Sequence, residues 1–151
     1  MNTFICRVAC IAALTLFITA SFAQSDPLKP ARLTPDEFTW VSSPSSGNPQ
    51  APLAGDPQKS GMYAYRTRFA ANFRNQPHFH PDERIVTIIS GTLHVGYGEQ
   101  FDESKMKALP AGSIWTEPAK QPHFVWAKDG EVVIQVIGYG PSATTPVQSK
   151  Q

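Results

Sequence analysis

From Gly61 onward, apolar and polar residues alternate in short runs separated by turn-forming residues. In residues 62–73, MYAYRTRFAANF, one side carries Tyr63, Tyr65, Thr67 and Phe69, and the other carries arginines. A period of two is that of a β-strand whose faces meet different environments. The runs RIVTIISG and TLHVGYG follow, and a helical period is almost absent. The pattern therefore predicts an all-β fold, an antiparallel barrel or sandwich.

Two local patterns predict turns. Lys128-Asp129-Gly130 separates the runs HFVWA and EVVIQVIGYG, and Asp-Gly tolerates the positive φ of a tight hairpin, so a hairpin is expected there. Thr34-Pro35-Asp36-Glu37 matches a capping box with Pro at the first helical position, which predicts a single helical turn leading into Phe38 and Trp40.

The chain divides into four segments. Residues 24–57 are rich in Pro, Ser and Gly, and because Pro fixes φ and lacks a donor, we expect an irregular arm packed over the domain by its aromatic residues. Residues 58–143 form the predicted β-barrel, and residues 144–151 a flexible C-terminal tail.

Residues 1–23 have the pattern of a secretory signal peptide. A positive charge at Arg7 precedes the apolar run VACIAALTLFITA, and the small residues of Ser21-Phe22-Ala23 follow. The apolar run is too short for a membrane-spanning helix. We therefore expect a periplasmic or secreted protein that has no membrane association after cleavage.

Charge and cysteine content limit how the fold can be stabilised and which partners it can bind. Both cysteines, Cys6 and Cys10, lie in the leader, so the remaining 128 residues must be stabilised by their core, helped by a metal if one is bound. Arg7 is the only one of 13 basic residues in the leader, which leaves 12 basic against 12 acidic residues. This balance gives no electrostatic basis for binding nucleic acid, and a small molecule is the expected partner.

Three of the four histidines are candidate metal ligands. His78 and His80 are two apart on a strand, so their side chains share a face, and two imidazoles on one face can bind one divalent ion. His123 lies where a Pro-bounded turn enters a later strand that could return beside the first. His94 alternates with Leu93 and Val95 and is left out of the site.

These residues resemble the two motifs of the cupin superfamily. PHFHPDERIVTIISGTL resembles the first motif, a His-x-His pair followed by an acidic residue and a closing glycine, and LPAGSIWTEPAKQPHFVWA resembles the second. The likeness extends from about Gly55 to Pro141 and is greatest to small bacterial single-cupin proteins of the ChrR-like kind. It implies a cupin-type antiparallel jelly-roll barrel in which His78, His80 and His123 bind one divalent ion, Zn, Fe, Mn or Ni. Cupins often dimerise, so the resemblance also implies a homodimer.

The carboxylate ligand is the open question. The motif's glutamate normally lies seven residues before the closing glycine, and counting back from Gly91 reaches Arg84, with Glu83 one residue earlier. Adjacent strand residues face opposite sides, so a shift of one residue decides the matter. Either Glu83 turns inward as a ligand or catalytic base, or the site has three histidines and an open side.

One further residue is a candidate for the site. Gln135 is a lone amide in the apolar strand VVIQVIG, and a buried amide there needs hydrogen-bond partners near the metal; the alternative is an outward-facing position. Tyr65 and Phe69 either line the pocket or belong to the core.

The resemblance implies two classes of function. The first is a metalloenzyme with dioxygenase, isomerase or lyase chemistry on a small molecule, and three-histidine sites resemble those of thiol and diketone dioxygenase cupins. The second is a non-catalytic metal- or ligand-binding module, because ChrR-like cupins serve as zinc-binding sensor modules.

Overall fold

A computed structural model of the protein describes residues 27–148. In this range the chain consists of short β-strands with two single turns of 3₁₀ helix and no α-helix. In chain order the elements are η1 (Pro35–Glu37), β1 (Val41–Ser42), β2 (Pro49–Ala54), β3 (Gly61–Phe69), β4 (Arg74–Phe79), β5 (Arg84–Ser90), β6 (Thr92–Tyr97), η2 (Glu103–Lys105), β7 (Lys107–Pro110), β8 (Ile114–Glu117), β9 (His123–Trp126), β10 (Val132–Gly140) and β11 (Thr145–Pro146).

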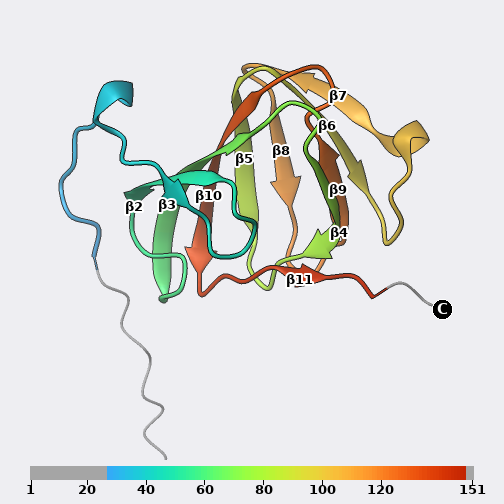
Figure 1. The fold of residues 1–151 in the computed structure, drawn as a ribbon. Helices are drawn as coiled ribbons and strands as arrows, with labels where there is room; N and C mark the ends of the chain where they lie inside the picture. The colour runs from blue at the N-terminus through green and yellow to red at the C-terminus, as the bar shows by residue number, and fades with distance from the viewer. Residues whose placement is uncertain (1–26, 149–151) are drawn as a thin grey trace, which may run out of the picture.

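The strands form two antiparallel sheets, which confirms the predicted all-β fold (Figure 1). The six-stranded sheet has the order β1-β2-β3-β10-β5-β8, and the five-stranded sheet has the order β11-β4-β9-β6-β7. The core contains side chains from both sheets, including Val86 and Val136 from one and Leu93 and Val125 from the other. In β10 every second residue is buried, as expected of a strand with one face on the core.

The arm is more regular than its composition predicts. Pro49–Ala54 is a paired strand, so the expectation of an irregular segment is wrong there. Its register against β3 shifts between Pro52 and Ala54, and such an irregularity accommodates a residue that cannot donate to the ladder. The turn at Thr34 is confirmed as the 3₁₀ helix η1, with its capping box formed. Beyond it, the Phe38 ring stacks on an arginine of the outer face of β3.

The connections between strands mostly join one sheet to the other. The predicted hairpin at Lys128-Asp129-Gly130 is wrong, because β9 pairs in the five-stranded sheet and β10 in the six-stranded one. The chain does turn at these residues, with Gly130 at φ 150°, but it crosses from one sheet to the other. Gly91 joins β5 to β6 in the same way at φ 78°, and a Cβ there would lie 2.3 Å from the Glu131 carbonyl oxygen, so only glycine fits.

Part of the predicted flexible tail is ordered against the barrel. Thr145 and Pro146 form β11 and pair with Phe79 and His78 of β4, so the tail packs along the strand that carries His78. The predicted signal peptide, residues 1–23, lies outside the described residues. Within residues 27–148, no helix has the length and apolar character needed to cross a membrane.

Candidate metal centre

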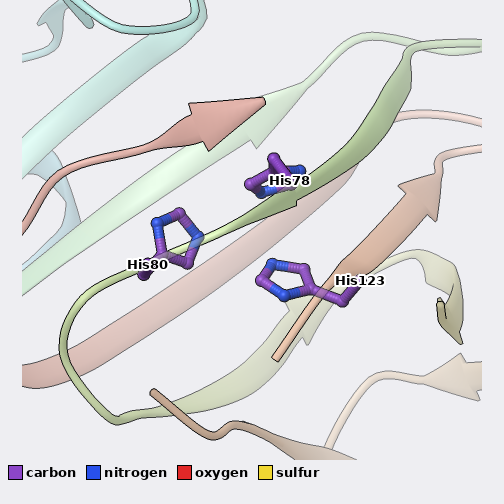
Figure 2. Close-up of side chains that lie close together, drawn as sticks. All are labelled: His78, His80 and His123. Carbon is purple, nitrogen blue, oxygen red and sulfur yellow. The ribbon is translucent and has the colours of Figure 1, made fainter. Parts of the chain in front are cut away.

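Three buried histidines converge inside the barrel (Figure 2). His78 lies in β4 directly opposite His123 in β9, as partners in the antiparallel ladder, and His80 follows one residue beyond the end of β4. The side chains of His78 and His80 point inward while Phe79 between them does not, as the period of a strand requires. One ring nitrogen from each histidine lies within 4.8 Å of those of the other two.

The backbone sets the orientation of each ring. The Nδ1 atoms of His78, His80 and His123 lie 2.7, 2.7 and 3.1 Å from the carbonyl oxygens of Gln76, Ala143 and Gln121. A carbonyl can only accept, so each Nδ1 carries the hydrogen and each Nε2 presents a lone pair. Metal-binding histidines usually have the ring nitrogen that does not bind the metal held by a hydrogen bond in this way.

The charge state of the rings suits metal binding. Burial lowers the pKa of His80 and of His123 to about 3, and it also lowers the pKa of His78, so all three are neutral near pH 7. His123 Nε2 is buried and has no hydrogen-bond partner. An orphaned acceptor among three converging lone pairs fits a divalent cation, and imidazole suits zinc, iron and nickel in particular.

A carboxylate does lie beside the histidines, but it is Glu117. This residue ends β8 and is 5% exposed, with Oε2 3.4 Å from His80 Nε2 and Oε1 3.6 Å from His123 Nε2. Burial raises its pKa to about 7, against the opposing effect of the guanidinium of Arg84. Arg84 is its direct partner across the β5–β8 ladder, with Nη1 3.4 Å from Oε2.

Arg84 is the centre of a buried polar network. Its Nε donates to Asp82 Oδ2 at 3.3 Å, and its other guanidinium nitrogens donate to Tyr65 and Ser142 as well as to Glu117. Asp82 Oδ2 also accepts from the Tyr63 hydroxyl at 2.5 Å. One buried cation therefore serves two buried carboxylates, as a buried ionic group requires.

The histidines and Glu117 line a cavity of about 280 Å³. Its wall is mixed: polar side chains come from the arm, from β3 and β4 and from the residue before β11, and aromatic rings come from β3, from the turn between β3 and β4, and from β8. The polar residues include Ser43, Ser45, Gln50, Thr67, Asn75 and Thr144, and the aromatic ones are Tyr65, Phe69, Phe73 and Trp115. A cavity of this size accommodates a small molecule.

Two residues predicted for the site are not brought to it. Glu83 is exposed and lines a second depression with Ile85 and Tyr139, which Arg84 and Glu117 also border. Inward residues in β5 begin at Arg84, so the residue before it faces outward. Gln135 also faces outward, between the buried residues of β10, and its Oε1 accepts from the Arg66 Nε at 3.1 Å. The outward alternative therefore holds for this amide.

The fourth histidine lies outside the cluster, as expected, whereas the carboxylate beside the histidines is a residue that was not expected there. His94 lies away from the cluster, with Nε2 2.8 Å from Asp129 Oδ2. Glu117 was not among the predicted residues. A signal for it exists, because in IWTE the alternation that buries Trp115 also buries Glu117.

Two antiparallel sheets around an inward-facing histidine cluster define a small β-barrel with a candidate metal centre. The chain matches the cupin family model over residues 56–150 and belongs to that family. No curated protein sequence matches it at a significant level.

Solved structures share the fold at low sequence identity. The polyketide cyclase RemF from Streptomyces resistomycificus is 14% identical with a TM-score of 0.67, over 82% of this chain and 89% of that one. KdgF from Halomonas sp. is 16% identical with a TM-score of 0.58, over 80% and 97%. A sugar phosphate isomerase from Silicibacter pomeroyi is 18% identical with a TM-score of 0.54, over 73% and 76%.

Proposed function

We propose that this protein is a divalent-metal-dependent enzyme that converts a small molecule in the cavity beside the histidine cluster, by dioxygenase, isomerase or lyase chemistry. The observation that carries the proposal is the convergence of three neutral, backbone-oriented imidazoles whose Nε2 lone pairs face a cavity of about 280 Å³. The folds of a cyclase and an isomerase are similar, which is compatible with this range of reactions.

The protein's own groups supply the rest of the chemistry. His78, His80 and His123 would hold the ion, Zn, Fe, Mn or Ni, which as a Lewis acid polarises a substrate oxygen. The serines of the arm and Thr144 offer hydroxyls to a polar substrate, and the aromatic side of the cavity excludes water. Tyr65 keeps its proton near neutral pH, because burial raises its pKa to about 12, so it can donate a hydrogen bond.

Metal analysis of the purified protein tests the proposal, with His123→Ala as the site variant and His94→Ala as the matched control. We expect about one equivalent of metal in the wild type and in His94→Ala, and none in His123→Ala. Oxygen uptake with a panel of thiols and diketones, and product analysis with isomerase and lyase substrates, then tests turnover. A wild-type protein that binds no divalent ion would refute the proposal. Bound metal without turnover of any substrate would favour the alternative, a non-catalytic metal- or ligand-binding sensor module.

We also propose a periplasmic or secreted location, on the basis of the signal-peptide pattern in residues 1–23. Mass spectrometry of the protein from its native cell should find a mature chain that begins at Gln24. An uncleaved chain in the cytoplasmic fraction would contradict this location.

A further inference from the structure

In its ionised form, Glu117 places acceptor oxygens against the acceptor nitrogens of two histidines. The Nε2 atoms of His80 and His123 present lone pairs, because their Nδ1 hydrogens go to backbone carbonyls. Glu117 places its two oxygens 3.4 and 3.6 Å from these same nitrogens. Ionised carboxylate oxygens accept only, so these contacts need either a proton on the carboxyl group or a cation between the groups, and a single proton can satisfy only one of the two nitrogens.

The separations fit neighbouring ligands of one ion. Zinc binds imidazole nitrogen and carboxylate oxygen at about 2.1 Å, which puts adjacent ligand atoms about 3.0 to 3.4 Å apart in octahedral or tetrahedral geometry. Both oxygen–nitrogen separations at Glu117 are at or just above the upper end of this range. The carboxylate therefore needs only a small adjustment to share an ion with the histidines.

We propose that Glu117 is the fourth protein ligand of the metal site, beside His78, His80 and His123. This inference rests on the metal site of the proposed function and adds the carboxylate that Glu83 does not supply. Its position on β8 differs from the position on β5 at which the sequence motif places an acid, where this chain has Arg84.

Arg84 acts as the positioning residue for this ligand. It is the cross-strand partner of Glu117, and its Nη1 lies 3.4 Å from Oε2, so it orients the carboxylate toward the histidines. The guanidinium also contacts Asp82, whose charge balances it. Glu117 therefore remains available to the ion and makes the site a weaker Lewis acid than three neutral histidines would.

Titration with cobalt(II) tests the assignment, because the visible spectrum of this ion reports its ligands directly. The variants are Glu117→Gln and Glu117→Asp, with Glu83→Gln as the matched control on the exposed neighbouring acid. Glu117→Asp keeps the charge next to Arg84, so it preserves the fold if the amide variant does not. Circular dichroism checks the fold of each, and competition with a chelator gives the affinity.

We expect Glu117→Gln and Glu117→Asp to bind cobalt(II) at least about tenfold more weakly, with a changed spectrum, and Glu83→Gln to match the wild type. An unchanged wild-type spectrum in both Glu117 variants overturns the inference, even if the affinity falls, because Glu117 then acts only from outside the coordination sphere. In that case the wild type still binds cobalt(II), and the proposed metal site stands. Failure of the wild type itself to bind cobalt(II) overturns the proposed metal site and this inference together.

Discussion

Replacement of Arg84 by methionine should destabilise the metal-free protein strongly. Arg84 is 7% exposed, and it is the cation that faces two carboxylates, Asp82 and Glu117, which are themselves 8% and 5% exposed. Methionine fills much of the same space but leaves both acids without a counter-charge. Loss of one partner of a buried ion pair costs about 3–5 kcal/mol. The total stability of a domain is about 5–15 kcal/mol, so the expected loss is at least about a fifth of it.

Urea unfolding at pH 7 in the presence of a chelator measures this loss. The expected fall in the free energy of unfolding corresponds to a decrease in Tm of roughly 10–20 °C for a domain of this size. The double variant Arg84→Met/Glu117→Gln removes one of the two stranded charges and should recover more than about 1 kcal/mol relative to Arg84→Met alone. A loss below about 1 kcal/mol in Arg84→Met, or no recovery in the double variant, would refute the view that Arg84 neutralises these buried acids.

Three further outcomes are expected. Between pH 7 and pH 5 the metal-free protein should lose stability, measured by urea unfolding. His80 and His123, with pKa values of about 3, stay neutral in the folded state but take up protons near pH 6.5 when unfolded, which removes about 2 kcal/mol each, whereas the raised pKa of Glu117 restores about 2 kcal/mol. Equal or greater stability at pH 5 would contradict this. Zinc at a hundred times its Kd should add about 2.7 kcal/mol to the wild type and nothing to His123→Ala, measured as Tm with and without zinc. Gly96→Ala should cost about 1–3 kcal/mol, because its Cβ would lie 2.4 Å from the buried ring of Phe124, and an unchanged Tm would show that the ring can move away freely.

The sequence predicts the histidine centre well because one local rule determines two of its three members. The period of two along a strand places His78 and His80 on one face, and the burial of both confirms it. The third member needs non-local information, since His123 meets His78 only through the β4–β9 ladder. Its motif position supplied that information, because no local pattern specifies which strands pair.

The outward positions of Gln135 and Glu83 show where local rules stop. A lone amide in an apolar strand is compatible with either face, and the choice depends on the phase of burial in β10, which the neighbouring strands set. The wrong prediction of a hairpin at Lys128-Asp129-Gly130 also arises because a local pattern does not determine the pairing of strands. Turn chemistry specifies a change of direction, but whether the next strand pairs with the last or crosses to the other sheet depends on the whole topology.

The carboxylate beside the histidines comes from a strand that the motif does not indicate. Counting along the motif from Gly91 reaches Arg84, and this count is correct: Arg84 faces inward. A buried arginine needs an acid, and the directly opposed residue on β8 is Glu117, whose carboxylate also reaches the histidines. The acid that compensates the arginine is therefore the same one that faces the centre. Cross-strand partners lie on one face of a sheet, so Glu117 can approach the cluster from the adjacent strand without a change in register. The sequence motif suggested only two arrangements, an inward Glu83 and a three-histidine site with an open side. The structure has a third, in which the acid comes from the neighbouring strand.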